Sequence, residues 1–223
     1  MKSKILSLLF CTLSFSQAAT YVLTNNQGSP ASSNAITNSA GTAFRSGVAG
    51  VASVGYFNVD DASLTGATSS SIFTSNFVAW NTATSPNADG SVNFVNSVTP
   101  VFARGYFTMN AASRTVSGSA FANKNMYILV GNGLTFAAST EFLVLKSTAQ
   151  FLASDDPTLP NVTVRFTNSN TSVLFGTTGS SVQTTQTDAT SNPSWATAAP
   201  IPETSTSLLG AIGALALLRR RRN

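Results

Sequence analysis

Few residues of this chain are of a type that performs covalent or metal chemistry. The 223 residues include no histidine and one cysteine, Cys11. Without histidine, the Ser-His-Asp and Cys-His nucleophilic systems are excluded, together with the commonest ligand of transition metals. Cys11 lies in an N-terminal segment that we expect to be removed, so zinc and iron–sulfur sites built on thiolates are excluded as well. We therefore expect no catalytic residue, no cofactor and no resident metal.

Carboxylate chemistry is the remaining route to an enzyme. A glycoside hydrolase needs two carboxyl groups about 5–10 Å apart, one of them with a raised pKa. Glu141, at the edge of a predicted strand, would have to converge with an aspartate in one cleft. A serine paired with Lys124 or Lys146 is a second route, although no motif marks one. A hydrolase is thus the third of three functional hypotheses.

Oxygen-rich turns are the segments in which calcium would bind. Residues 87–90, Asn-Ala-Asp-Gly, resemble part of an EF-hand loop, but Ser85 and Asn96 occupy its first and twelfth ligand positions. One charged ligand remains, so a turn is predicted there. The Asp-Asp pairs at 60–61 and 155–156 are also interpreted as solvated turns.

Aromatic residues give the second hypothesis, a carbohydrate-binding surface module. Aromatic faces stack on sugar rings, and Trp80 and Trp195 are the candidate ligand-binding residues. The hypothesis requires exposed, roughly coplanar rings, and it fails if both tryptophans are buried. Tyr56 and Tyr106 are expected to fill the core of the domain.

The elements that hold these residues are predicted to be strands. Between residues 21 and 200 no long segment has helical periodicity, and short apolar runs are separated by Gly, Asn, Asp, Ser and Pro. This pattern predicts an all-β fold, a β-sandwich that could be of the jelly-roll type. A short helix is predicted within residues 69–80. The clearest strands are predicted at residues 51–59, 101–109, 126–130, 141–146, 162–166 and 173–175.

Four segments make up the predicted domain organisation. Residues 1–18 are a signal peptide, 19–176 the β-sandwich domain, 177–200 a Ser/Thr-rich linker, and 201–223 a C-terminal sorting signal with a short transmembrane helix. The linker is predicted from its low-complexity composition, and it would carry the domain off the membrane as a stalk.

Charged residues are scarce and scattered. They make up 9% of the chain, against roughly 25% in ordinary soluble proteins. The basic balance comes from the two ends, because residues 19–200 contain six Lys or Arg and seven Asp or Glu. A nucleic-acid interface needs clustered Lys and Arg, so no nucleic-acid partner is expected.

The N-terminus has the three parts of a secretory signal peptide. Lys2 and Lys4 form a positive region, an apolar stretch covers residues 5–15, and small residues follow at Ser16 and Ala18. Cleavage is predicted between Ala18 and Ala19, and export would use the Sec machinery.

The C-terminus has three parts in a fixed order. The motif Pro202, Glu203, Thr204 comes first, an apolar stretch covers residues 208–218, and the basic cluster Arg219, Arg220, Arg221 and Arg222 follows. With the three preceding residues and snorkelling arginines, this stretch just reaches across a bilayer core about 30 Å thick. The arginines are expected to remain on the cytoplasmic side of the membrane, which places the preceding domain on the outer side.

This tail resembles the PEP-CTERM sorting signal of Gram-negative bacteria, in which Pro-Glu-Pro precedes a short apolar helix and an arginine cluster. Thr204 stands where the family has its second proline. The resemblance covers about the last two dozen residues. It implies processing by an exosortase-type enzyme and association with extracellular polysaccharide. Two alternatives remain open, a sortase signal similar to Leu-Pro-x-Thr-Gly and a permanent membrane anchor without processing.

The first hypothesis is accordingly an exported structural or adhesive protein of the cell surface or extracellular matrix. It would be held transiently in the inner membrane by its C-terminal helix, and it would not be an enzyme. The ligand, the oligomeric state and the activity of the β domain are not specified by these motifs.

Overall fold

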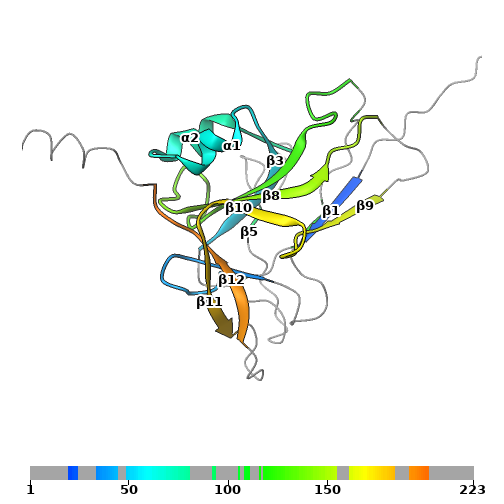
Figure 1. The fold of residues 1–223 in the computed structure, drawn as a ribbon. Coiled ribbons are helices and arrows are strands. Elements are labelled where there is room, and N and C mark those ends of the chain that lie inside the picture. The colour runs from blue at the N-terminus through cyan, green and yellow to red at the C-terminus, as the bar shows by residue number, and fades with distance from the viewer. Residues whose placement is uncertain are drawn as a thin grey trace, which may run out of the picture.

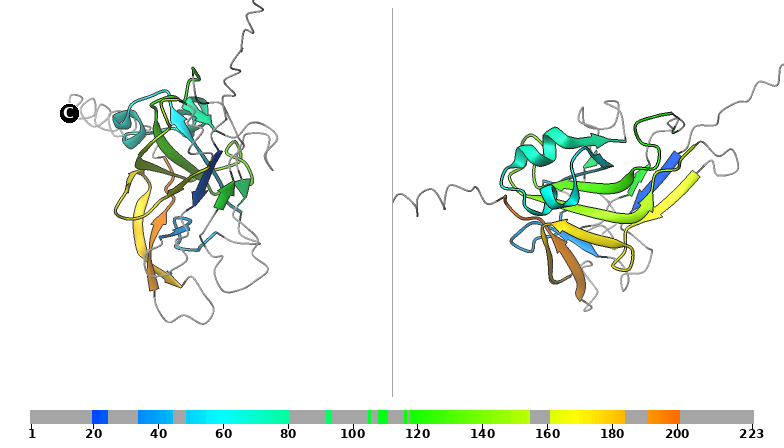
Figure 2. Two further views of the ribbon diagram at one scale, coloured as in Figure 1. Left: turned by 90° about the vertical axis from the view of Figure 1, so that its right-hand side faces the viewer. Right: turned by 45° about the horizontal axis from the view of Figure 1, so that its top comes forward.

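The computed structural model describes residues 20–24, 34–44, 49–80, 92–93, 105, 108–110, 116, 118–154, 161–183 and 191–200. Within these ranges the chain forms mostly strands, with two short helices, so the predicted all-β class is confirmed. Figures 1 and 2 show the strands and helices from three directions.

Much of the core is organised around an antiparallel sheet of six strands. From one edge of the sheet to the other, the strands are β10 (Thr171–Phe175), β8 (Phe142–Gln150), β7 (Asn125–Gly131), β3 (Val51–Phe57) and β4 (Phe77–Ala79). The short strand β5 (Val92–Asn93) also pairs with β3. All seven residues of β3 are buried. Since side chains alternate between the faces of a strand, this sheet is covered on both of its faces at β3.

The helices α1 (Asp61–Thr65) and α2 (Ser70–Asn76) lie together on one side of β3 and β8 (Figure 1). The buried residue of α2 is Phe73, whose ring centre lies 5.2 Å from that of Phe142 and 4.7 Å from that of Phe175. These ring contacts fix α2 against β8 and β10.

A cluster of aromatic rings forms a second part of the core. Trp80, directly after β4, stacks on Phe151 with ring centres 5.0 Å apart and an interplanar angle of 14°. Tyr21 and Phe121 each meet the Trp80 ring edge-on at 4.9 Å. All four side chains are essentially without solvent exposure. Edge-on and stacked pairs add to the free energy that burial of the rings contributes.

A smaller sheet brings the beginning of the described chain beside a distant strand. The strand β1 (Thr20–Thr24) pairs in parallel with β9 (Asn161–Arg165) and antiparallel with β6 (Thr108–Asn110). The Tyr21 hydroxyl accepts a hydrogen bond of 3.0 Å from the Leu152 amide. This contact connects the smaller sheet to the chain just after β8.

The third sheet has the order β11 (Thr177–Gln183), β12 (Ser191–Ala196) and β2 (Ala35–Thr37). Beyond β12, the Thr197 amide donates to the Thr37 carbonyl at 2.9 Å. Ala198 and Phe142 then exchange two backbone hydrogen bonds of 2.8 Å each. The chain is therefore bonded to the body of the protein as far as Ala198.

This third sheet corrects the predicted linker at 177–200 and the predicted end of the domain at 176. The described part of that segment belongs to the fold, because it forms two paired strands and its Trp195 is buried in the core. Backbone hydrogen bonds do not depend on apolar side chains, and threonine favours strands. A Ser/Thr-rich composition therefore did not distinguish an exposed stalk from a paired strand.

The remaining predicted elements agree closely with the structure. The strands predicted at 51–59, 126–130, 141–146, 162–166 and 173–175 are confirmed as β3, β7, β8, β9 and β10. The helix predicted within 69–80 is α2, which is followed at once by β4. Most of the strand predicted at 101–109 lies outside the described residues. The turn predicted at residues 60–61 is instead the start of α1.

Both predicted targeting signals fall outside the described residues. This applies to the cleavage point at Ala18 and Ala19, to the motif Pro202–Thr204 and to the arginine cluster at 219–222. In the described part of the chain, no helix has the length and apolar character needed to cross a membrane.

Candidate functional site

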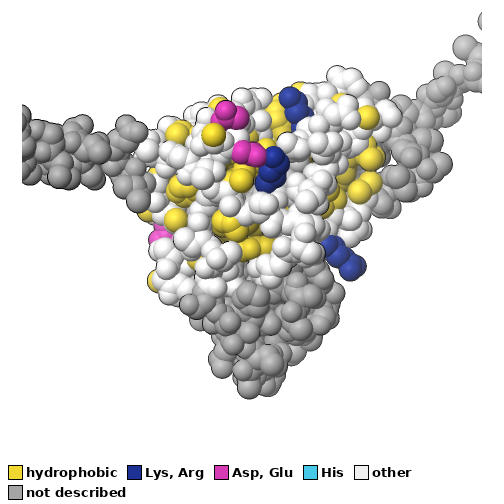
Figure 3. Space-filling model, viewed as in Figure 1, with side chains coloured by type: hydrophobic (Ala, Val, Ile, Leu, Met, Phe, Trp, Pro, Cys, Tyr) yellow, Lys and Arg dark blue, Asp and Glu magenta, His cyan; other side chains and the backbone are white. Residues whose placement is uncertain are grey.

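Charged side chains are few on the described surface, and most of them gather at one place (Figure 3). The described ranges contain six charged residues. Four of these line a single cleft of about 330 Å³, namely Asp60, Asp61, Lys124 and Lys146. The described surface thus concentrates most of its charge in this cleft, which is the candidate site, while Glu141 and Arg165 lie elsewhere.

Three separate parts of the chain bring these four residues together. Asp60 and Asp61 follow β3 at the start of α1, Lys124 directly precedes β7, and Lys146 lies within β8. Tyr127 is paired with Lys146 across β7 and β8, so the two side chains emerge on the same face of the sheet. The site therefore depends on the strand register of the six-stranded sheet.

Asp60 is the N-cap of α1. Its Oδ1 accepts a hydrogen bond of 2.8 Å from the Ser63 amide, a donor that the helix itself leaves unpaired. This contact with Ser63 lowers the pKa of Asp60. The residue that follows this cap, Asp61, is the first residue of α1.

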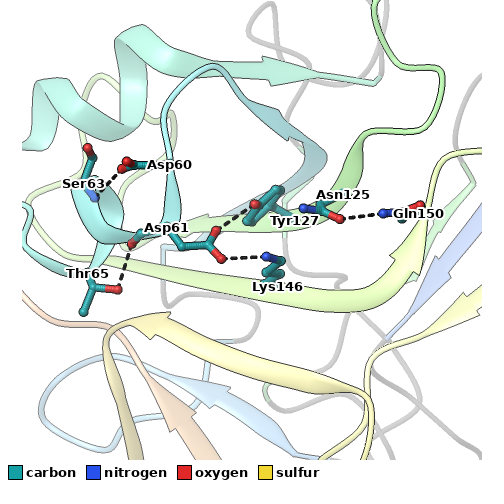
Figure 4. A network of polar contacts seen from close by, with 8 residues as sticks. All are labelled: Asp60, Asp61, Ser63, Thr65, Asn125, Tyr127, Lys146 and Gln150. Atoms are coloured by element: carbon teal, nitrogen blue, oxygen red, sulfur yellow. Dashed lines mark hydrogen bonds and ion pairs between the residues drawn. The ribbon is translucent and has the colours of Figure 1, made fainter.

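Asp61 is the centre of a hydrogen-bonded group (Figure 4). Its Oδ1 accepts 2.8 Å from the Tyr127 hydroxyl, and its Oδ2 lies 2.6 Å from Lys146 Nζ. The ion pair is partly exposed, with 28% of the Lys146 side chain and 40% of the Asp61 side chain accessible to solvent. Lys146 Nζ also lies 5.8 Å from the centre of the Tyr127 ring. One carboxylate thus orders both of its partners at the mouth of the cleft.

The protonation of these partners limits the chemistry of the cleft. Burial is the main cause that raises the pKa of Tyr127, and the hydrogen bond to Asp61 adds to it. The hydrogen bond to Asp61 is the main cause that raises the pKa of Lys146. A nucleophilic lysine or a tyrosine that serves as a base needs a lowered pKa instead. Both groups are therefore set up at neutral pH as hydrogen-bond donors.

The other side of the cleft carries Lys124 and Asn125. Lys124 is exposed, and its Nζ lies 5.6 Å from the centre of the Tyr56 ring. Asn125 Oδ1 accepts a hydrogen bond of 3.0 Å from Gln150 Nε2, which fixes the orientation of the amide. The Tyr56 ring thus lies under the Lys124 ammonium on this side of the cleft, and Gln150 orients the Asn125 amide beside it.

Glu141 forms a separate polar cluster. Its carboxylate accepts from Ser39 Oγ at 2.5 Å, from the Ser39 amide at 3.0 Å and from Thr197 Oγ1 at 2.6 Å. Burial opposes ionisation, but these hydrogen bonds outweigh it and lower the pKa of Glu141. No carboxylate is among these partners, and the described residues include no cluster of three metal-binding side chains. The described partners of Glu141 give it a structural function, and the second carboxyl group required of a hydrolase is not among them.

The two predicted ligand-binding residues, Trp80 and Trp195, are both buried, with 0% and 1% exposure. This corrects the prediction, because a sugar ring cannot stack on a face that the core already covers. Trp80 packs against Phe151, Tyr21 and Phe121. A carbohydrate-binding face made of these tryptophans is therefore excluded.

The sequence indicates Lys124 and Lys146 only as nucleophile candidates, and no local pattern connects either of them with Asp61 or Tyr127. Asp61 lies 66 residues from Tyr127 and 85 residues from Lys146 in the chain. The one local feature that indicates this site is the pair of aspartates at 60–61, which directly follows an apolar strand. That signal is typical of a helix start as well as of a turn.

Comparison with models of known protein families finds no match, and comparisons with curated proteins and with solved structures find none either. The fold and the site therefore define the class by themselves. This is an all-β protein with a cleft of mixed charge on a surface that otherwise carries little charge.

Proposed function

We propose that this chain is an exported, non-enzymatic protein of the cell surface or extracellular matrix, sorted by its C-terminal signal. The observation that carries the proposal is the fixed order of the tail, in which Pro202-Glu203-Thr204 precedes an apolar stretch and four arginines. An exosortase-type enzyme would process the tail after the N-terminal signal is removed. Extracellular polysaccharide is the proposed environment of the mature protein.

The proposed architecture of the body is a β-sandwich. Two observations favour it: every residue of β3 is buried, and three sheets share one apolar core that contains both Trp80 and Trp195. A signal helix before this body and a short hydrophobic helix after it complete the proposal.

A structural or adhesive role agrees with the chemistry of the described body. Tyr127 and Lys146 have raised pKa values, which suit hydrogen bonding and disfavour nucleophilic attack. The described partners of Glu141 are Ser39 and Thr197. The packed core would give a stable unit outside the cell without any disulfide, since the mature chain would contain no cysteine.

The test is the intact mass of the protein recovered from membrane, surface and medium fractions of native cells. We expect a species that begins at Ala19 and ends between Pro202 and Ser205, with any group that the processing enzyme attaches. Glu203→Ala should retain the full C-terminus in the membrane fraction, whereas Thr206→Ala should be processed normally. A native protein that keeps Arg219–Arg222 in the membrane fraction would show that the tail is a plain anchor, and the sorting proposal would be wrong.

A further inference from the structure

We propose that the cleft between α1 and the start of β7 binds a carboxylated sugar unit of an acidic polysaccharide, with Lys124 as the partner of the sugar carboxylate. The inference rests on the proposed surface function for its biological setting. It adds a binding site, a ligand class and the residues that distinguish this ligand from a neutral sugar.

The charge balance within the cleft identifies Lys124 as the group that is available to an anion. Lys146 is paired with Asp61, and this is the ion pair found among the described residues. Asp60 uses one carboxylate oxygen to cap α1, where the positive end of the helix dipole also favours its charge. Lys124 lies over the Tyr56 ring, which attracts a cation without neutralising it.

The remaining polar groups suit the hydroxyls of a sugar ring. The Asp60 carboxylate and the Lys146 ammonium each retain hydrogen-bonding capacity beyond their contacts, which are to Ser63 for Asp60 and to Asp61 and Tyr127 for Lys146. Acceptors and donors placed side by side can bond neighbouring hydroxyls, of which each is both a donor and an acceptor. Asn125, oriented by Gln150, adds an amide at the same wall.

The size of the cleft limits how much of a polysaccharide it holds. A volume of about 330 Å³ lies at the lower end of the range of ligand pockets, which is about 300–1,000 Å³. We therefore expect one sugar unit to occupy the cleft while the rest of the chain continues into solvent. Because the site is partly exposed, each contact is weak, and retention would come from rebinding to the many linked units of one polymer.

The experiment compares trigalacturonate with its methyl ester, which has the same sugar chain but no carboxylate charge. Binding is measured by titration calorimetry with the full-length chain at low and at moderate salt. Since a cationic tail attracts any polyanion, all four tail arginines, Arg219–Arg222, are replaced by glutamine in every sample. The test variant is Lys124→Met, which keeps the apolar stem over Tyr56. The control is Arg165→Met, which removes one exposed positive charge from β9, away from the cleft.

We expect the methyl ester to bind about two- to fivefold more weakly than trigalacturonate, the fold-change expected from losing one partly exposed ion pair. Lys124→Met should weaken trigalacturonate by the same factor and leave the ester unaffected, whereas Arg165→Met should change neither. The preference for trigalacturonate should shrink as salt is raised.

Equal affinity for the two ligands, absence of binding, or an equal effect of both variants would overturn the inference. The comparison of the two ligands uses a protein with Lys124 intact, so it remains decisive even if Lys124→Met proves unstable. Loss of the ligand preference together with a correctly processed native protein would refute the binding site alone. Binding by a protein whose tail is not processed would refute the sorting proposal alone.

Discussion

Thr197 donates a hydrogen bond of 2.6 Å to Glu141, and this contact joins the end of β12 to the residue that precedes β8. The same carboxylate accepts two hydrogen bonds from Ser39, shortly after β2. One partly buried acid thus connects three segments of the chain. This makes Glu141 a stability determinant whose contribution depends on pH.

The first prediction concerns acid. The pKa of Glu141 in the folded protein lies below its ordinary value of 4.5. Its contribution to the free energy of unfolding is therefore complete above pH 4.5 and is lost as the pH falls through the folded pKa. Glu141→Gln should lower this free energy by about 1 kcal/mol at pH 7. Denaturant titrations at pH 7 and at pH 3 should show the difference between variant and parent becoming smaller in acid.

Thr197→Val is the matched control for that experiment, because it removes one donor and keeps the carboxylate. It should also cost about 1 kcal/mol at pH 7. A difference between Glu141→Gln and the parent that is the same at both pH values would contradict the proposed linkage.

The second prediction separates two neighbouring acids. Asp61→Asn should lower the free energy of unfolding by about 1 kcal/mol at pH 7, since the partly exposed ion pair to Lys146 is lost. Asp60→Asn should leave it nearly unchanged, because asparagine caps a helix about as well as aspartate. Thermal melting of both variants measures the contrast. Equal destabilisation by the two substitutions would show that the Asp61 group contributes nothing specific.

The same ion pair predicts a change in alkali. The pKa values of Lys146 and Tyr127 are both raised by folding. Their contributions are therefore complete below about pH 10 and are lost as the pH rises through the folded values. The stability difference between Asp61→Asn and the parent should accordingly narrow above pH 10. A constant difference from pH 7 to pH 11 would argue against this group.

The third prediction concerns Trp80. Because its ring is completely buried and stacked on Phe151, Trp80→Ala should lower the free energy of unfolding by about 3–5 kcal/mol. Leu134, which is 67% exposed, is the control, and Leu134→Ala should stay within about 0.5 kcal/mol of the parent. Urea denaturation of both variants gives the comparison. A small effect of Trp80→Ala would mean that the ring is not part of the core.

The fourth prediction compares two glycines. A Cβ at Gly55 would lie 2.0 Å from the Val78 carbonyl oxygen, a backbone atom of the neighbouring strand β4. Gly55→Ala should therefore cost about 2 kcal/mol by forcing the strands apart. At Gly66, where the nearest atom is the Ala62 oxygen at 3.4 Å, alanine should be neutral or should stabilise by about 0.5 kcal/mol. Thermal unfolding distinguishes the two outcomes, and tolerance of Gly55→Ala would contradict the observed strand pairing.

The central strands were predictable because runs of apolar side chains mark them in the sequence. The buried run of β3 and the apolar run of β7 stand out between turn-forming residues, and α2 shows its short apolar spacing. β11 and β12 were not predictable in the same way. Their pairing depends on backbone hydrogen bonds and on the burial of a few side chains of β12, Trp195 among them, and a polar composition indicates neither.

Local sequence patterns could not predict the cleft, and the reason is a different one. Asp61, Tyr127 and Lys146 meet only because β7 and β8 pair in a register that places Tyr127 opposite Lys146. Register is a property of two strands together, so neither segment alone contains it. The tryptophans were misjudged for a related reason, since an aromatic side chain suits a sugar and a core equally well, and only packing decides between them.

The position of β12 between β11 and β2 also determines how the protein would respond to mechanical force. The proposed sorting tail follows β12 in the sequence, so tension applied through the C-terminus would run along this strand. The hydrogen bonds to β11 and β2 lie across that direction, as do the two bonds between Ala198 and Phe142. Under such tension these bonds would be loaded together in shear. A segment whose composition suggested an exposed spacer is instead the part of the fold that would bear tension, if the proposed C-terminal signal holds the protein at a surface.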